Sequence, residues 1–304
     1  QGTADAIFQN IYTLQHEKPD LVLILSGDHI YKMDYRKMIA YHLEKGADLT
    51  VASIRMDRRL SKEFGVMEVD REGRIMGFQE KPEEPRTIPG DPEGILASMG
   101  IYIFNTETLV RRLIENARSD SSHDFGKDII PAMIKKDRVF NFDFSKGDCG
   151  GMGYWKDVGT VESLWEANMD LRSVQPSLDL YTRDWPIRNA IYNDPPAKFI
   201  FNEYERRGQA LNSIVSGGCI ISGGLVSDSV LGRNVFIHSY AEVKESILMD
   251  NVDIGRRVRI RRTIIDKNVK VPQDTVIGYD PEADKRRFFM DESGLVVIKK
   301  DYQF

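Results

Sequence analysis

Apolar residues in the first half of the chain follow helical spacing in some segments and form short continuous runs in others. Residues 4–15 have the spacing of a helix, whereas 21–25 form an aliphatic run typical of a strand buried on both faces. A helix over 34–45 and a strand over 49–54 follow. This order predicts an α/β domain whose parallel sheet lies under helices. Further predicted elements are a β-hairpin over 65–69 and 74–78, strands over 96–104 and 139–144, helices over 106–117 and 124–135, and a last helix that begins after Thr160 and runs through Arg172.

The second half of the chain carries a sequence repeat. A Ser or Thr followed by two aliphatic residues recurs every 16 or 17 positions, at Ser213, Ser229, Ser246 and Thr263. Such a repeat is typical of a hexapeptide-type parallel β-helix, whose coils bury a shared core only when they stack. A β-sandwich is the less favoured alternative, because its strands do not repeat in sequence.

The change of period divides the chain. Residues 175–205 include Pro195-Pro196 and show no sustained period, so they predict a connector on the surface. We therefore expect a first domain over 1–174, a connector over 175–205, and a β-helix domain with a C-terminal tail over 206–304.

Charge and cysteine content exclude several classes of protein. With 42 Lys and Arg against 47 Asp and Glu, the net charge is -5, which gives no general attraction to nucleic acid. Cys149 and Cys219 are far apart, which argues against a disulfide scaffold and a structural zinc site. No apolar run approaches the ~18 residues of a membrane span. We expect a soluble cytoplasmic protein with no nucleic-acid or membrane partner.

Two aspartates are candidate metal ligands. Asp28 follows a predicted buried strand, at the sheet edge where open α/β folds bind ligands. A carboxylate there can hold Mg²⁺, although capping of the following turn explains it equally well. Asp157 is the second candidate, because Lys156 and the start of a helix flank it and both suit a phosphate.

Other short motifs indicate a sugar-phosphate site. In Glu80-Lys81-Pro82 the lysine can neutralise a phosphate and the glutamate can accept hydrogen bonds from sugar hydroxyls, but a solvated turn has the same sequence. Ser98-Met99-Gly100 suits the close approach of a ligand, or a simple β-bulge. The histidines His29 and His123 lack a regular ligand spacing and are interpreted as structural. The absence of Gly-x-Ser-x-Gly and Gly-x-Gly-x-x-Gly argues against a hydrolase and a dehydrogenase.

Together these motifs resemble one family. The segments that carry the resemblance are Gln1-Gly2-Thr3-Ala4-Asp5-Ala6, Ser26-Gly27-Asp28-His29-Ile30-Tyr31, Phe64-Gly65-Val66, Glu80-Lys81-Pro82, Ala97-Ser98-Met99-Gly100, Ser122-His123-Asp124-Phe125-Gly126-Lys127-Asp128 and Trp155-Lys156-Asp157-Val158-Gly159-Thr160. In this order they resemble the glucose-1-phosphate adenylyltransferases, also called ADP-glucose pyrophosphorylases. The resemblance extends through the connector to the β-helix and spans essentially the whole chain.

The resemblance implies a fold, a reaction and a set of site residues. The fold is a Rossmann-like nucleotide-diphospho-sugar transferase domain followed by a left-handed β-helix. The reaction joins ATP and α-D-glucose 1-phosphate to give ADP-glucose and pyrophosphate, the first step of glycogen or starch synthesis, and the enzyme is a homotetramer. The implied catalytic residues are Asp28 and Lys81, and the implied Mg²⁺ ligands are Asp28 and Asp157. The resemblance also implies that Lys81 binds the sugar phosphate and that the glucose site is lined by Gly65, Glu80 and Ser98. It implies that Gly2 and Thr3 lie near the adenine.

One feature of the family has no counterpart in the chain. The family begins with a Gly-rich strand-to-helix loop, Gly-Gly-x-Gly-x-Arg-Leu, that surrounds the ATP phosphates, and Gln1 follows that loop. We therefore expect this chain to be a fragment of a longer enzyme, N-terminally incomplete in its first domain and inactive by itself.

Three alternative functions stay open. Nucleotidylyltransferases that make UDP- or dTDP-sugars share the fold, and the family also contains non-catalytic regulatory subunits, although Asp28, Lys81 and Asp157 are all present here. The hexapeptide repeats alone suggest an acyltransferase. The acyltransferase hypothesis is weakened by the lack of a well-placed catalytic histidine, because His238 is the only histidine in the repeats.

A basic cluster is the candidate control site. Five arginines lie within 256–262, and strand alternation predicts that Arg257, Arg259 and Arg261 share one face. Like charges this close repel one another unless an anion or an acidic partner lies between them, so a solvated basic face competes with an effector site. The resemblance implies that phosphorylated metabolites bind there. The predicted effector residues are Arg259, Arg261, Arg286 and Arg287.

Overall fold

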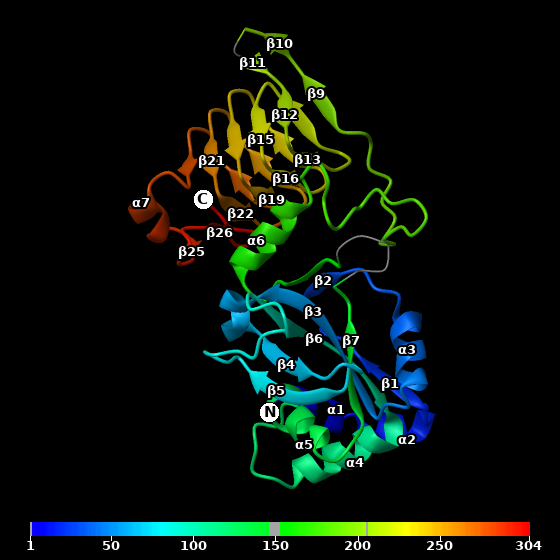
Figure 1. The fold of residues 1–304 in the computed structure, drawn as a ribbon. Coiled ribbons are helices and arrows are strands. Elements are labelled where there is room, and N and C mark those ends of the chain that lie inside the picture. The colour runs from blue at the N-terminus through cyan, green and yellow to red at the C-terminus, as the bar shows by residue number, and fades with distance from the viewer. Residues whose placement is uncertain (1, 146–152, 205) are drawn as a thin grey trace. The chain divides into compact units, whose positions relative to one another are not determined.

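The computed structural model describes residues 2–145, 153–204 and 206–304. It consists of two compact units, Gln1–Trp155 and Lys156–Phe304 (Figure 1). The helix expected to end the first domain, before residue 174, thus belongs to the second compact unit. No helix among the described residues is both long and apolar enough to cross a membrane.

A six-stranded sheet forms the centre of the first unit. Its strands follow the order β5-β4-β6-β3-β7, and β1 also pairs with β6. The strands of this sheet are β1 (Leu21–Ile24), β3 (Leu49–Asp57), β4 (Gly65–Val69), β5 (Ile75–Glu80), β6 (Gly94–Asn105) and β7 (Val139–Asp143), and a separate short strand β2 (His29–Tyr31) pairs with β8 (Trp155–Asp157). The helical segments are α1 (Thr3–Phe8), α2 (Ile11–Glu17), α3 (Tyr35–Glu44), the 3-10 helix η1 (Arg58–Glu63), α4 (Thr106–Ala117), the π-helical turn η2 (Phe125–Ile129) and α5 (Ile130–Ile134).

The expectation of a parallel sheet is wrong for most of these strand pairs. Among the described strands of this sheet only β3 and β7 pair in parallel, whereas β1, β3 and β4 all run antiparallel to β6. The residues of β1 are also only half-buried. Aliphatic runs reflect burial under helices, and that burial is similar whichever way the neighbouring strand runs. The hydrophobic pattern therefore indicated the layers but not the strand directions.

Helices cover both faces of this sheet. Residues of α1, α4 and α5 pack with Leu49 and Val51 of β3 in one apolar cluster. Met38 of α3 packs with Ala52 and Ile54 of the same strand in another. Alternate residues of β3 thus face opposite layers, as strand geometry requires. The α/β prediction for this unit is confirmed, but the helix predicted over 4–15 is interrupted between α1 and α2.

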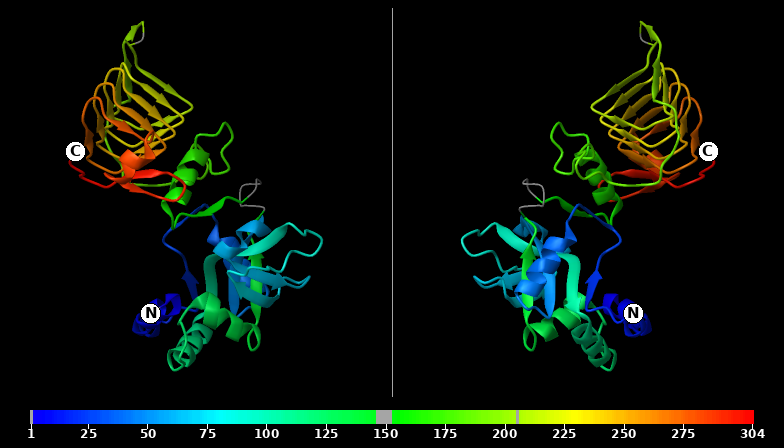
Figure 2. Two further views of the ribbon diagram at one scale, coloured as in Figure 1. Left: turned by 90° about the vertical axis from the view of Figure 1, so that its left-hand side faces the viewer. Right: turned by 90° about the vertical axis from the view of Figure 1, so that its right-hand side faces the viewer.

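The second unit is a three-sided parallel β-helix, and helix α6 (Val161–Asp170) packs on its outside. Figures 1 and 2 show its coils stacked one upon the next. One sheet has the order β12-β15-β18-β21-β24, the second β13-β16-β19-β22-β26-β25 and the third β23-β20-β17-β14-β9. The elements are β9 (Lys198–Ile200), β10 (Asn202–Glu203), β11 (Arg206–Arg207), β12 (Gln209–Leu211), β13 (Ile214–Val215), β14 (Ile220–Ser222), β15 (Leu225–Ser227), β16 (Val230–Leu231), β17 (Phe236–Ile237), β18 (Glu242–Lys244), β19 (Ile247–Leu248), β20 (Asp253–Ile254), β21 (Arg259–Arg261), β22 (Thr263–Ile265), β23 (Lys270–Val271), β24 (Val276–Ile277), α7 (Pro281–Lys285), β25 (Phe289–Met290) and β26 (Val296–Ile298). The predicted parallel β-helix is confirmed, and β9, within the predicted connector, already pairs with β14.

The repeated hydroxyl residues explain the sequence period. The backbone N–H of Ser229 donates to Ser213 Oγ, that of Ser246 to Ser229 Oγ, and that of Thr263 to Ser246 Oγ. Each hydroxyl also donates to the carbonyl two residues before it. Ser229, Ser246 and Thr263 are fully buried. A buried backbone N–H needs a partner, so each coil supplies one to the next and the motif must recur at the coil length.

Residues with left-handed backbone form the corners between the three sheets. Tyr240, Arg257 and Asp274 have φ of 64°, 56° and 64° and lie 17 residues apart. Arg257 is thus a corner residue outside β21, so the prediction that it shares a strand face with Arg259 and Arg261 is wrong. Alternation holds for the strand itself, where Arg259 and Arg261 are exposed and Ile260 is buried.

Candidate active site

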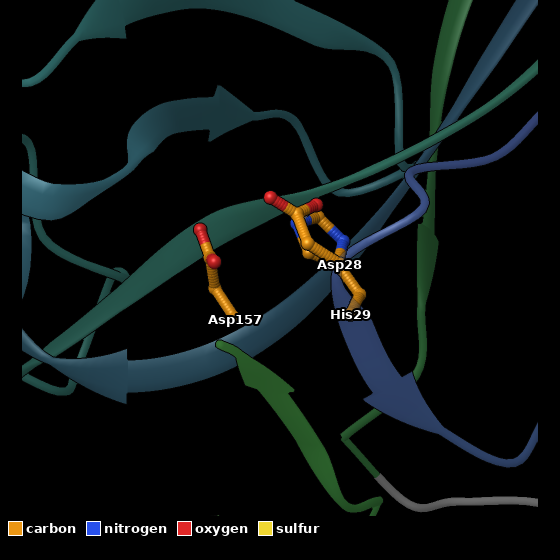
Figure 3. A group of neighbouring side chains, drawn as sticks. All are labelled: Asp28, His29 and Asp157. Atoms are coloured by element: carbon orange, nitrogen blue, oxygen red, sulfur yellow. The ribbon is translucent and has the colours of Figure 1, made fainter. Parts of the chain in front are cut away.

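The two predicted metal ligands lie close together. Asp28 follows β1, Asp157 ends β8, and ligand atoms of both residues and of His29 all lie within 4.8 Å of one another (Figure 3). Ser26 Oγ donates to Asp28 Oδ1 at 2.7 Å, and this hydrogen bond lowers the pKa of the Asp28 carboxyl. Asp157 Oδ1 accepts from the backbone N–H of Gly159 at 2.8 Å. Carboxylate oxygens are the donors that Mg²⁺ prefers, so this pair suits such an ion.

His29 fixes the surroundings of this pair. Its ring meets Trp155 edge-on at 4.9 Å, and Trp155 Nε1 donates to His29 Nδ1 at 3.3 Å. Because Nδ1 accepts a hydrogen bond, the ring hydrogen is assigned to Nε2, which lies 3.7 Å from Asp28 Oδ1. The largely buried His29 therefore connects Trp155 with the exposed Asp28.

The predicted glucose-site residues lie in one row across the sheet. Gly65 of β4 is directly opposite Glu80 of β5. On its other side β4 pairs antiparallel with β6 through Val66 and Ala97, and this register brings Gly65 next to Ser98. Three residues from separate parts of the sequence thus meet side by side on adjacent strands.

Two glycines leave room for the Glu80 carboxylate. A Cβ added to Gly65 would lie 3.1 Å from Glu80 Oε2 and would overlap the Phe78 ring, and one added to Gly126 would lie 2.6 Å from the same oxygen. Any larger residue at Gly126 would therefore displace the carboxylate. The role of Gly126, in the π-helical turn η2, was not predicted, although the motif that contains it was noted.

The Glu80 carboxyl has a shifted acidity. It is half-buried, and burial, with a smaller contribution from the negative charge of Asp124, raises its pKa. Tyr102 lies near both carboxyls, and its own burial raises its pKa to about 12. A smaller contribution from the Ser98 side chain lowers the pKa of Tyr102. Tyr102 was not predicted as a site residue, although it lies four residues after Ser98 on β6. Shifted acidity of this kind is frequent in binding and catalytic sites.

Lys81 immediately follows Glu80. Its side chain is exposed, and within the described part of the chain its ammonium group forms no ion pair. Its backbone is left-handed, with φ of 49°, and its N–H donates to the Phe64 carbonyl at 3.1 Å. Left-handed backbone costs a non-glycine residue roughly 1–2 kcal/mol, and such strain is often found at functional sites.

Gly100 connects this row with the metal ligands. It lies two residues after Ser98 on β6 and has φ of 65°. A Cβ added there would lie 3.0 Å from His29 Cε1. The register between β3 and β6 also shifts here, so both interpretations of Ser98-Met99-Gly100 apply: there is a bulge, and it allows a close approach.

Gly2 and Thr3 pack against the loop that carries Asp124. Thr3 Oγ1 donates to Asp124 Oδ2 at 2.9 Å and accepts from the backbone N–H of Phe125 at 3.0 Å. A Cβ on Gly2 would overlap the carbonyl oxygens of Ser122 and His123. The Thr3 hydroxyl therefore already has protein partners, and any role of this pair toward adenine is carried by the resemblance alone.

The predicted effector arginines have partners of several kinds. Arg259 Nε lies 3.5 Å from Glu242 and Arg261 Nε lies 3.2 Å from Glu245, both on the preceding coil. Arg286 is exposed at the end of α7, and the Arg287 guanidinium lies over the rings of Phe288 and Phe304. The repulsion among the β21 arginines is thus balanced by carboxylates of the protein itself.

A large open cavity lies away from these residues. It has a volume of about 1110 Å³, lies between α2 and α4, and is lined by Leu14, Val110 and Ile114 among others. None of the predicted site residues lines it.

Two family models match the chain. The one described as nucleotidyl transferase matches residues 1–174, and the one described as GlmU-like, C-terminal hexapeptide, matches 195–298.

Curated relatives match almost the full length of the chain. The chain is 52% identical to the glucose-1-phosphate adenylyltransferase of Rhodopirellula baltica over 99% of the chain and 68% of the relative. Its identity is 50% with that of Nitrosococcus oceani and 48% with that of Nitrosospira multiformis, each over 98% of the chain and 71% of the relative.

The chain belongs to the glucose-1-phosphate adenylyltransferase family. The family resemblance expected from the ordered motifs is thereby confirmed. So is the predicted fold class, an α/β nucleotidyltransferase domain followed by a hexapeptide β-helix. In this chain, the motifs around Asp28, Gly65, Glu80 and Ser98 converge through the pairing of β4, β5 and β6 and the close approach at Gly100.

Proposed function

We propose that the protein transfers AMP from ATP to α-D-glucose 1-phosphate, giving ADP-glucose and pyrophosphate in the first step of glycogen or starch synthesis. The observation that carries this proposal is the row of Glu80, Gly65 and Ser98, connected through Gly100 to the surroundings of Asp28. The names of the relatives support it. A sugar phosphate is already a competent nucleophile, so the site needs positioning and charge neutralisation rather than a covalent intermediate.

Mg²⁺ is the proposed cofactor, held by Asp28 and Asp157. When bound, it would neutralise charge that builds up on the phosphates of ATP. Asp28 is prepared for this role by Ser26, which keeps the carboxylate ionised and oriented. His29 holds the backbone next to Asp28 through its contact with Trp155.

Lys81 and Glu80 are the proposed groups for glucose 1-phosphate. The Lys81 ammonium, exposed and without an ion pair in the described residues, would bind the phosphate. Glu80 and Ser98 would accept and donate hydrogen bonds to sugar hydroxyls beside Gly65. Gly2 and Thr3 are proposed to border the adenine through their contact with the loop at Asp124.

Two rival functions are separated from this one by a single assay. The complete protein is supplied with glucose 1-phosphate, Mg²⁺ and either ATP, UTP or dTTP, and the nucleotide sugar is quantified. ADP-glucose formed at least tenfold faster than the other products is expected. A preference for UTP or dTTP would assign a different nucleotidylyltransferase, and no product with any nucleotide would favour a regulatory subunit.

The proposal includes assembly and control. A cytoplasmic homotetramer that responds to phosphorylated metabolites follows from the family, with Arg259, Arg261, Arg286 and Arg287 as effector residues. The test replaces Arg259 and Arg261 by Ala and titrates sugar bisphosphates, AMP and inorganic phosphate. Because both arginines face carboxylates of the protein, midpoints within twofold of the wild type would assign them to fold stability alone.

A further inference from the structure

Strand β8 directs neighbouring side chains to opposite sides. Trp155 and Asp157 have the same parity, and both lie beside His29. Lys156 between them points to α6, where its Nζ lies 3.1 Å from Glu166 and 3.2 Å from Asp170. The Lys156 side chain is 24% exposed. This lysine was expected to face a phosphate, but its charge is balanced by two carboxylates of one helix.

The helix that receives Lys156 is itself firmly held on the β-helix. Trp165 Nε1 donates to the Glu245 carbonyl at 2.8 Å, and the Arg262 guanidinium lies 4.6 Å from the centre of the Trp165 ring. Arg262 also pairs with Glu162 at 3.3 Å. At the other end Arg172 pairs with Asp228 at 3.1 Å. Polar contacts at both ends and an aromatic contact between them fix α6 along the coils.

The apolar side of α6 completes this attachment. Met169 packs in one cluster with Ile247 and Ile264, which project outward from the second sheet of the β-helix, and with Leu295. All four side chains are buried. Burial of apolar area of this kind dominates helix docking, so α6 and the coils form one body.

Only a short segment separates Asp157 from this body. The Asp157 carboxylate accepts from Gly159 N–H, and Thr160 then caps α6 with a reciprocal capping box to Ser163. The start of α6 is therefore fixed relative to Asp157 on one side, and the two ion pairs of Lys156 fix the strand from the other. Backbone rotation at β8 would have to break one of these sets of contacts.

From these contacts we propose that Lys156 is a positioning residue for metal binding. Its ion pairs with Glu166 and Asp170 hold β8 against α6 and thereby fix the direction of the Asp157 carboxylate. The proposal rests on the proposed function in taking Asp28 and Asp157 together as the metal ligands. It assigns to the contacts of Lys156 with α6 an indirect effect on metal affinity, exerted through Asp157.

The test measures metal binding apart from catalysis. Mn²⁺ binding to the complete protein is followed by electron paramagnetic resonance of the free ion, for the wild type and for Lys156→Met, which keeps the length of the side chain and removes its charge. Loss of two partly exposed ion pairs is expected to weaken Mn²⁺ binding by roughly fivefold. Turnover at saturating metal should stay within about twofold, because Lys156 does not touch the reacting groups.

Two further variants separate positioning from a general effect of charge. Lys156→Arg can form the same ion pairs and should restore Mn²⁺ affinity to within about twofold of the wild type. Lys270→Met removes an exposed cation of β23 elsewhere in the same unit and should leave affinity unchanged. If Lys156→Met and Lys270→Met weaken Mn²⁺ binding equally, net charge is responsible and the positioning role is overturned.

Asp28→Asn distinguishes the failure of this proposal from the failure of the proposed function. If that variant binds Mn²⁺ like the wild type, the metal assignment itself is wrong, and the role of Lys156 is wrong with it. If Asp28→Asn weakens binding while Lys156→Met does not, the metal site stands and the positioning role alone is overturned.

Discussion

The two units of the molecule differ in how they use charged side chains. In the β-helix, Arg257, Arg259 and Arg261 each face a carboxylate on a neighbouring coil, at distances of 2.6, 3.5 and 3.2 Å. In the α/β unit, Lys81 has no ion pair within the described residues, and burial raises the pKa of its neighbour Glu80.

This difference separates charges that serve the fold from charges that are free for a ligand. A repeating coil places opposite charges one repeat apart, so it neutralises its own arginines. At the α/β sheet edge the exposed Lys81 ammonium has no ion pair within the described residues, so it can bind an incoming anion without first breaking a contact of the fold.

The strongest test of the α/β side is Asp28→Asn. An amide keeps the hydrogen bond to Ser26 but brings no charge to a metal, so turnover of the complete protein should fall by about three orders of magnitude. Steady-state kinetics over a range of Mg²⁺ concentrations measure it. The matched control is Asp34→Asn at the N-cap of α3, where asparagine caps equally well. Near-normal turnover of Asp28→Asn in saturating Mg²⁺ would remove Asp28 from the site.

Lys81→Ala tests whether the unpaired cation serves the sugar phosphate. Loss of a charge-assisted hydrogen bond should raise the KM for glucose 1-phosphate by about 10- to 100-fold and change the KM for ATP by less than about twofold. The two constants are measured separately by varying one substrate at saturation of the other. Equal increases in both would place Lys81 outside the sugar-phosphate site.

Gly126→Ala sharpens the account of Glu80. The new methyl group would lie 2.6 Å from Glu80 Oε2, so the carboxylate must move and the KM for glucose 1-phosphate should rise by roughly 5- to 10-fold. Gly77→Ala is the matched control in β5, because its Cβ would approach only the Glu68 side chain, at 3.2 Å, and not Glu80. If both variants have the same KM as the wild type, the close packing around Glu80 does not matter for binding.

The smallest expected effect concerns a buried histidine in the α/β core. His42 is 1% exposed and hydrogen-bonded to Thr50 and Asn105, and burial lowers its pKa from 6.5. The unfolded chain then binds the proton more readily than the folded one, so stability is complete above pH 6.5 and falls as the pH drops below it. Between pH 7.5 and 5.5 the loss is up to about 1.4 kcal/mol. Urea unfolding at both pH values measures the free energy of unfolding. This free energy should depend less on pH in His42→Gln than in the wild type. The same pH dependence in both proteins would show that His42 does not titrate.

The β-helix was the easier unit to predict from the sequence. Each coil contacts only its neighbours, so the structural repeat appears directly as the spacing of Ser213, Ser229, Ser246 and Thr263. The pairing of Arg259 with Glu242 follows from the same 17-residue interval and was overlooked. Arg257 was misplaced, because strand alternation was extended into a corner with left-handed backbone.

The α/β site was predicted as separate motifs rather than as an arrangement. Glu80, Gly65 and Ser98 were each identified, but their alignment depends on strand register between distant segments, which local patterns do not determine. Tyr102 and Gly126 were missed for the same reason, since an ordinary strand tyrosine and a helix-turn glycine gain their meaning only from neighbours far along the chain. The direction of Lys156 was likewise set by α6, not by the adjacent residues.

The contrast between free and paired cations is tested most directly by thermal unfolding with and without glucose 1-phosphate. Lys81→Met should leave the Tm of the free protein within about 1 °C of the wild type and abolish the stabilisation by the sugar phosphate. Arg257→Met should lower the Tm of the free protein by about 1–2 °C, through loss of its contact with Asp274, and keep the full stabilisation by ligand. The reverse pattern, with Lys81→Met destabilising the free protein and Arg257→Met abolishing the ligand effect, would contradict the account.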